Sequence, residues 1–267
     1  TLNNGADTVT LSDDRVYLKG GVFETNVSTY PLASTSMNQT GINFSVNAQE
    51  TSPYGIAWDG THYWVVGNTA DRAFKYTAAG VYTGTSFYLG GQISIPNGII
   101  WDGTFFWVMA NTGVVYKFNS AGTYQNVSWT AGGGLGNPAD LGWDGTHFYI
   151  TDYILKKVFK YTSAGVAVTN YDLSAQTVQT YGITWDGTFF WVSCLTNDRV
   201  YKYNSSFVYQ GESFNIAAYA VTATGLAFDG TYIAVLGVTS DKVWQFAPAV
   251  GVASVSNLGG QNYVRVA

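Results

Sequence analysis

The sequence predicts an all-β fold made of five similar units that close into a ring. Two observations point to it. The tetrapeptide Trp-Asp-Gly-Thr, or a close variant, recurs every 42 or 43 residues, with copies that start at Trp58, Trp101, Trp143, Trp185 and Phe228. Each copy is followed by short runs of aromatic and β-branched residues, which are typical of strands. A period of about 40 to 50 residues indicates a repeat fold, in which neighbouring units bury one another's apolar faces.

The first repeat, residues 55–97, has the pattern of four antiparallel strands. We expect these strands at Gly55–Trp58, Thr61–Val66, Arg72–Tyr76 and Tyr82–Leu89. Asp59-Gly60 separates the first two, and Asp-Gly between two β runs predicts a hairpin with a type I′ turn. Four antiparallel strands per repeat are typical of a blade, so the sequence predicts a five-bladed β-propeller.

Two sets of turn residues recur with the repeat. The first hairpin of each blade is expected to use Asp59, Gly60, Asp102, Gly103, Asp144, Gly145, Asp186, Gly187, Asp229 and Gly230. Three further aspartates, Asp71, Asp198 and Asp241, share a loop position before the third strand. Asp side chains in turns commonly accept hydrogen bonds from neighbouring backbone amides, so we expect these residues to be structural.

The fifth repeat supplies only three strands, because Pro248 and the residues after it break the pattern. Residues 39–46 match 82–89, so we expect this N-terminal strand to pair with 242–246 and close the ring. The two chain ends then leave one face of the disc side by side. The loops between fourth and first strands lie on the opposite face, together with those between second and third strands.

The sequence therefore predicts three parts. Residues 1–36 form an N-terminal β attachment segment, residues 37–249 form the propeller, and residues 250–267 form a C-terminal strand segment that packs with the N-terminal one. The strand-like stretches at the ends are Thr8–Leu11, Arg15–Leu18, Val22–Thr25, Val252–Val255 and Tyr263–Val266.

The repeat resembles the NHL and YVTN group of propeller repeats. Gly182-Ile183-Thr184-Trp185-Asp186 and Arg199-Val200-Tyr201-Lys202-Tyr203 carry the resemblance, which covers residues 39–248 and implies the propeller fold. The acidic residue that this group has after the second strand is kept only as Asp152. Residues 17–25 and 259–266 look like connectors of tailed-phage tail-fibre and virion structural proteins. That second resemblance implies a virion-mounted head that binds a host-surface glycan or serves as a spike.

Composition narrows the range of partners. The formal net charge is −5, and the longest basic run is Lys156-Lys157, so we expect no nucleic-acid partner. No apolar run approaches the length of a membrane span, so we expect no insertion into a membrane.

Candidate catalytic residues are few. His62 and His147 occupy a repeat position that other blades fill with Phe or Tyr, and Cys194 is the single cysteine. Asp140 is the one acid among the first strands, and one carboxylate does not hold a catalytic metal. We therefore expect no catalytic residue, no metal, no cofactor and no enzymatic activity.

Binding residues are expected where the blades differ, in the loops that join fourth strands to first strands and in the tip of the third blade. The candidates are Gln49, Tyr54, Gln92, Asn97, Tyr153, Gln176, Tyr181 and Tyr219. Amides beside aromatic rings suit saccharides, because rings stack on sugar C–H faces while amides bond hydroxyls. The alternative is that these glutamines bond loop backbone.

Three functions follow from these observations. The first is a display and binding module, a virion-associated fibre or spike that recognises a host glycan or other receptor. The second is a structural virion or surface-layer component without a ligand, and the third is an extracellular propeller hydrolase or lyase. The first two place the chain in a virion or outside the cell. They also make it part of a larger oligomeric assembly that it contacts through its terminal β module.

Overall fold

The computed structural model describes residues 37–220 and 222–248, and the backbone of five short strands nearer the chain ends, at 2–3, 8–12, 15–18, 253–258 and 261–266. These residues form strands, turns and loops and contain no helix, so none of them could cross a membrane as a helix. The chain divides into two compact units, Met37–Pro248 and a unit built from both ends of the chain. The all-β prediction is confirmed.

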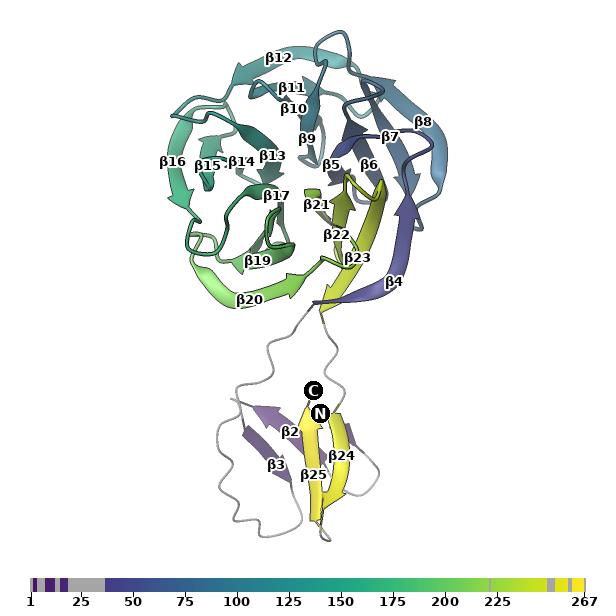
Figure 1. Ribbon diagram of the computed structural model, residues 1–267, viewed down its shortest axis with the longest axis vertical. Helices are drawn as coiled ribbons and strands as arrows, with labels where there is room; N and C mark the ends of the chain where they lie inside the picture. The colour runs from purple at the N-terminus through teal and green to yellow at the C-terminus, as the bar shows by residue number, and fades with distance from the viewer. Residues whose placement is uncertain are drawn as a thin grey trace. The chain divides into compact units, whose positions relative to one another are not determined.

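Met37–Pro248 is a five-bladed β-propeller of four-stranded antiparallel sheets, as predicted (Figure 1). Blade 1 consists of β5 (Pro53–Trp58), β6 (His62–Gly67), β7 (Arg72–Thr77) and β8 (Tyr82–Tyr88). Blade 2 consists of β9 (Pro96–Trp101), β10 (Phe106–Ala110), β11 (Val114–Phe118) and β12 (Tyr124–Thr130). Blade 3 consists of β13 (Pro138–Trp143), β14 (His147–Asp152), β15 (Lys157–Thr162) and β16 (Ala167–Asp172). Blade 4 consists of β17 (Thr180–Trp185), β18 (Phe190–Cys194), β19 (Arg199–Tyr203) and β20 (Tyr209–Asn215).

Blade 5 is closed by a strand from the other end of the unit. Its strands are β21 (Ala223–Phe228), β22 (Ile233–Gly237), β23 (Lys242–Pro248) and β4 (Met37–Ser45). β4 pairs with β23 in an antiparallel register that sets Phe44 opposite Val243. The predicted closure is confirmed. Met37 lies opposite Pro248, so the chain enters and leaves the propeller at neighbouring points.

The first strands of the blades surround the axis, and the fourth strands form the rim (Figure 1). We call the side with the fourth-to-first and second-to-third connections the loop face. The other side is the hairpin face, and both chain ends of the propeller are on it. The core lies between adjacent blades, where the second strands contribute Tyr63, Phe106, Phe148, Phe190 and Ile233, each at most 1% exposed. Burying one such side chain contributes about 1.5–3 kcal/mol, which accounts for the apolar pattern of every second strand.

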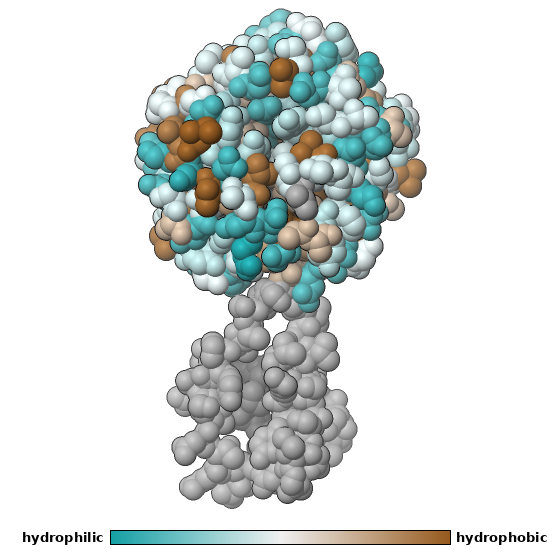
Figure 2. Space-filling view, viewed as in Figure 1, coloured by the Kyte–Doolittle hydropathy of each residue, from teal (hydrophilic) through white to brown (hydrophobic). Residues whose placement is uncertain are grey.

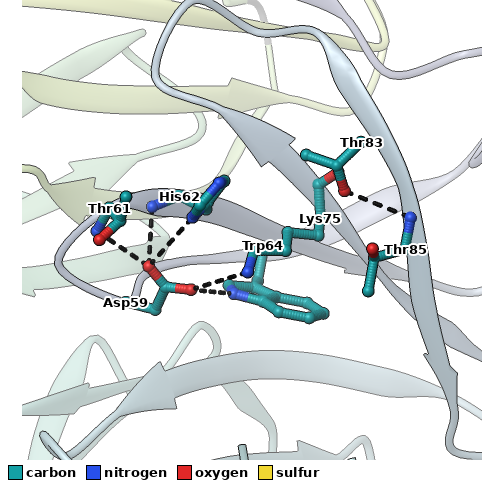
Figure 3. A network of polar contacts seen from close by, with 7 residues as sticks. All are labelled: Asp59, Thr61, His62, Trp64, Lys75, Thr83 and Thr85. Carbon is teal, nitrogen blue, oxygen red and sulfur yellow. Dashed lines mark hydrogen bonds and ion pairs between the residues drawn. The ribbon is translucent and has the colours of Figure 1, made fainter. Parts of the chain in front are cut away.

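The first hairpin of each blade is held by its aspartate (Figure 3). In blade 1, Asp59 Oδ1 accepts the backbone N–H groups of Thr61 and His62 at 2.9 and 2.7 Å, and Oδ2 accepts Trp64 Nε1 at 2.7 Å. The two Oδ1 hydrogen bonds recur at Asp102, Asp144, Asp186 and Asp229. The aspartate therefore serves the turn through its side chain.

The predicted type I′ turn is wrong, because only the glycine has positive φ. Gly60 has φ 94°, whereas Asp59 stays in the ordinary region. The Asp59 N–H donates to the His62 carbonyl at 3.0 Å, so the central residues are Gly60 and Thr61 rather than Asp59 and Gly60. The matching glycines of the other blades, Gly103, Gly145, Gly187 and Gly230, also have positive φ, which glycine adopts without steric cost.

The three aspartates before the third strands also act differently from the prediction. Asp71, Asp198 and Asp241 adopt left-handed backbone conformations, with φ of 51°, 49° and 48°. Within the described part of the chain, their carboxylates accept no hydrogen bond from neighbouring amides. Asp tolerates this conformation better than most residues, and that tolerance accounts for its recurrence.

The second unit contains two small sheets. β1 (Leu2–Asn3), β2 (Thr8–Ser12) and β3 (Arg15–Leu18) form one sheet, and β24 (Ala253–Leu258) and β25 (Gln261–Val266) form the other. Strand pairing among the described residues therefore stays within each end segment. The expected strand Val22–Thr25, residue Val252 and parts of the connector-like stretches 17–25 and 259–266 lie outside the described residues. The packing of the two end segments on each other stays a prediction.

Candidate functional site

The axis of the propeller is closed by backbone. The same position of the first strands is occupied by Gly55, Gly98, Asp140, Gly182 and Gly225. A Cβ atom built on Gly55 would lie 2.9 Å from Gly98 Cα, and one built on Gly225 would lie 2.8 Å from the Tyr54 carbonyl oxygen. Real Cβ atoms do not approach backbone so closely, so four of these positions require glycine. We call this layer the glycine ring.

Asp140 is the only member of the glycine ring with a side chain. Its carboxyl is 1% exposed and accepts the N–H groups of Leu141 at 2.9 Å and Ile183 at 3.0 Å, which joins blade 3 to blade 4. Burial raises the pKa of Asp140 well above its ordinary value, although the amides of Ile183, Leu141 and Leu226 oppose this rise. Among the described residues no group of three or more His, Cys, Asp or Glu side chains could hold a metal ion.

Three of the predicted binding residues meet on the loop face above the glycine ring. Tyr54, Tyr153 and Tyr181 come from blades 1, 3 and 4 and are half-buried. The rings of Tyr153 and Tyr181 have centroids 5.3 Å apart. Burial raises the pKa of Tyr181, and the phenols of Tyr153 and Tyr54 raise it further. We call these three residues the tyrosine cluster.

Three other predicted residues make contacts within the fold. Gln49 Oε1 accepts the Tyr76 hydroxyl at 3.2 Å, and Asn97 Nδ2 donates to the Pro138 carbonyl at 2.9 Å. Tyr219 packs against Trp244 and Phe246 in blade 5, with ring centroids 5.4 and 5.7 Å away. These contacts give each side chain a structural role.

Gln92 and Gln176 present their amides on loops. Gln92 is exposed and Gln176 is half-buried, and neither side chain has a hydrogen-bond partner among the described residues. Neither amide bonds the loop backbone, which was the alternative for these residues.

Buried acceptors, which the sequence did not reveal as a group, hold the loop face. Asp152 accepts four N–H groups, those of Gly136, Asn137, Ile154 and Leu155, between 2.9 and 3.0 Å. In blade 1 the residue that matches Asp152 is Gly67. Glu50, in the loop between β4 and β5, fills the space beside Gly67 and accepts the amides of Ser52, Thr69 and Ala70. Both acids are 0% exposed, so their role is structural.

The hairpin face has a second concave site, a cavity of about 110 Å³ on the axis. Its mouth is formed by one half-buried aromatic residue from each blade, and the five are Trp58, Trp101, Trp143, Trp185 and Phe228. We call them the aromatic ring. The signal for this site was in the sequence, since these are the residues that mark the repeat. They were interpreted only as a marker of the period.

Comparisons with known proteins agree on the fold. Neither a protein-family model nor a curated protein sequence matches the chain. Among solved structures, glutaminyl cyclase from Myxococcus xanthus has a TM-score of 0.60 at 9% identity, over 79% of this chain and 95% of that one. Virginiamycin B lyase from Staphylococcus aureus has a TM-score of 0.47 at 18% identity, over 73% of this chain and 66% of that one. The Pan2 WD40 domain from Neurospora crassa has a TM-score of 0.44 at 9% identity, over 73% and 63%. The chain thus spans less than two thirds of the lyase.

These comparisons contradict the expectation that the protein is not an enzyme. The expectation rested on the lack of clustered acids or histidines around the axis. A propeller cyclase nevertheless shares the fold over most of this chain. At 9% identity the likeness to the cyclase shows the fold alone and assigns no reaction to this chain.

Proposed function

We propose that the protein is a binding module of a virion or another extracellular assembly, and that its loop face recognises a host-surface glycan or another receptor. The observation that carries this proposal is the tyrosine cluster, in which the rings of Tyr153 and Tyr181 have centroids 5.3 Å apart and Tyr54 of a third blade contributes to the raised pKa of Tyr181. Tyrosine offers an apolar ring face for sugar C–H groups and a hydroxyl for sugar hydroxyls.

The surroundings of the cluster suit a polar ligand. Gln176 lies on the loop that leads to Tyr181, and its amide has no partner among the described residues. Ile154 and Leu155, which follow Tyr153, are 53% and 42% exposed and add apolar contact area. On the disc face seen in Figure 2, hydrophilic residues predominate and apolar ones form small separate groups. A surface of this kind suits a hydroxyl-rich ligand better than a large apolar interface.

The loop face is also free of the chain connections. Met37 and Pro248 both lie on the hairpin face, where the chain runs on toward the end segments. The terminal β module then contacts other virion or surface-assembly proteins within a larger oligomeric assembly. The likeness of residues 17–25 and 259–266 to connectors of tailed-phage fibres supports this part of the proposal.

A glycan array and binding to intact host envelopes test the proposal. Tyr181→Ala is expected to weaken glycan binding about tenfold, because one aromatic contact contributes about 0.5–1.5 kcal/mol beyond its buried area. Tyr88→Ala is the control, because Tyr88 is 58% exposed on the rim strand β8 and lies outside the cluster. Equal loss in both variants would contradict a site at the cluster. A wild-type protein that binds no glycan and no host surface would favour the structural component without a ligand.

A further inference from the structure

The aromatic ring on the hairpin face lies on the other side of the glycine ring from the tyrosine cluster, and we infer that it binds a small organic cation of the quaternary-ammonium type. This inference does not depend on the proposed function, because the two sites share no residue. It rests on the composition of the pocket, on the charges around its mouth and on its size.

The side chains that line the pocket are mostly aromatic and aliphatic, while backbone groups of the first strands supply its polar surface. Behind the aromatic ring its lining consists of Ile56, Ala57, Ile99, Ile100, Gly142, Ile183, Thr184, Leu226 and Ala227. Thr184 is the one lining residue with a side-chain hydroxyl, and no Lys, Arg or His lines the cavity. An anion would find no charged side-chain donor there. A cation without hydrogen-bond donors, or an apolar group, fits this lining.

The charges around the mouth favour the cation. Each member of the aromatic ring is followed directly by the hairpin aspartate of its blade. Five carboxylates therefore lie one residue from the lining, where each accepts hydrogen bonds from the amides of its own turn. The lysines of the third strands offset part of this charge, since Lys75 Nζ lies 3.9 Å from Asp59 Oδ2. Lys202 instead bonds Glu212 at 2.9 Å, and Lys117 lies 3.7 Å from the centroid of the Phe105 ring. Aromatic rings attract cations through the negative potential of their faces, which adds to the field of the carboxylates.

The volume limits the size of the guest. A cavity of about 110 Å³ is smaller than the engineered cavity of about 150 Å³ that holds one benzene molecule. The pocket therefore takes a compact head group such as trimethylammonium. The rest of the ligand would remain outside the mouth. The inner end is closed by the glycine ring, where the Asp140 carboxyl accepts the amide of the lining residue Ile183.

Paired titrations of the full chain with choline and with 3,3-dimethyl-1-butanol test the inference. The alcohol is the neutral carbon counterpart of choline, so it matches shape and apolar area and lacks only the charge. Calorimetry or tryptophan fluorescence gives both affinities. We expect choline to bind at least tenfold more tightly, because desolvated cation–π contacts discriminate strongly between charged and neutral guests. Equal or tighter binding of the alcohol would overturn the inference, and so would the absence of choline binding at millimolar concentrations.

Variants locate the site. Trp185→Leu is expected to reduce choline affinity at least fivefold, whereas Trp185→Phe should retain most of it, since blade 5 naturally has Phe228 at this position. Trp129→Leu is the matched control, because Trp129 is half-buried in the rim strand β12 and does not line the pocket. Equal loss for Trp185→Leu and Trp129→Leu would overturn the assignment. Tyr181→Ala should leave choline binding unchanged, which separates this test from the glycan test.

Discussion

The Tyr63 hydroxyl donates a hydrogen bond of 2.5 Å to the Asp229 carboxylate and so joins blade 1 to blade 5. In blades 1 to 4 the hairpin aspartate accepts two backbone amides of its turn and a third donor, which is a side chain of the second strand of the same blade. The donors are Trp64, Trp107, Tyr149 and Trp191. Blade 5 has Ala234 at that position, so the neighbouring blade supplies the missing donor across the seam where the ring closes.

Removal of this donor should weaken the closed ring. Tyr63→Phe leaves the Asp229 oxygen without its third donor and Gln245 Nε2 without the hydroxyl that accepts it at 3.0 Å. Because buried hydrogen bonds to charged groups contribute about 1.5–3 kcal/mol, we expect a loss of that size in the free energy of unfolding. Urea titration measures it.

Tyr203→Phe is the control for the loss of a buried hydroxyl. Tyr203 is 0% exposed, like Tyr63, and its hydroxyl has no hydrogen-bond partner among the described residues. We expect the free energy of unfolding to stay within about 0.5 kcal/mol or to rise, since an unsatisfied polar group is removed. Equal losses in the two variants would show that the Tyr63 hydrogen bond adds no stability beyond ring packing.

The buried carboxyl of Asp140 should give the stability a specific pH dependence. Its folded-state pKa is raised well above 3.8, so the folded state keeps the proton after the unfolded chain has lost it. The stabilisation from the bound proton is complete below the unfolded-state pKa and is lost as the pH rises through the folded-state pKa. We therefore expect the stability of the wild type, relative to Asp140→Asn, to fall as the pH rises above about 4. Urea titrations of both proteins between pH 3 and 8 measure this, and a difference that is flat or rising there would contradict it.

The glycine ring should not accept a methyl group. In Gly225→Ala the new Cβ would lie 2.8 Å from the Tyr54 carbonyl oxygen and 3.1 Å from the Ile56 nitrogen, both of them backbone atoms of the next blade. Forcing strands apart costs about 1–3 kcal/mol or more, which thermal unfolding would detect. Gly91→Ala is the control, since its Cβ meets no atom within 4 Å and its φ is not positive. If both substitutions have the same effect, close approach of the first strands is not the reason for glycine.

The closing strand can be tested at alternate residues of β4. Phe44 is 7% exposed and packs against Tyr63 and Tyr76, with ring centroids 5.8 and 5.6 Å away. Phe44→Ala should lower the free energy of unfolding by about 3–5 kcal/mol, because it leaves a cavity between the blades. Ile42→Ala, at a site 40% exposed, should change it by less than about 0.5 kcal/mol. Similar values for both would contradict the role of β4 as a packed member of blade 5.

The fold could be predicted because its signals repeat. One blade fixes the pattern, and the match of residues 39–46 to 82–89 identifies the closing strand without knowledge of any contact. The turn type could not be predicted, because the Asp-Gly pair is compatible with more than one two-residue loop. The turn type depends on which two residues are central. Only the structure shows the hydrogen bond from the Asp59 N–H to the His62 carbonyl, which makes Gly60 and Thr61 the central residues.

The candidate sites were predicted less well, for two physical reasons. The contact of Tyr153 with Tyr181 depends on the curvature of the ring, which brings residues of blades 3 and 4 together. The aromatic ring does not stand out in the sequence as a site, because its position is aromatic in all five blades and functional residues are expected where blades differ. A position that is aromatic in every blade becomes a candidate site once the blades surround one axis.

The pairing of Met37 with Pro248 also decides how the ring responds to mechanical load. If tension reaches the propeller through its two chain connections, it pulls on Met37 of β4 and Pro248 of β23. These two residues face each other at the same end of the two antiparallel strands. Their hydrogen bonds would then break one pair at a time, as in an opening zipper, and not all together as in shear. We therefore expect blade 5 to open first under tension, and blades 2, 3 and 4 to carry no direct force until it has opened.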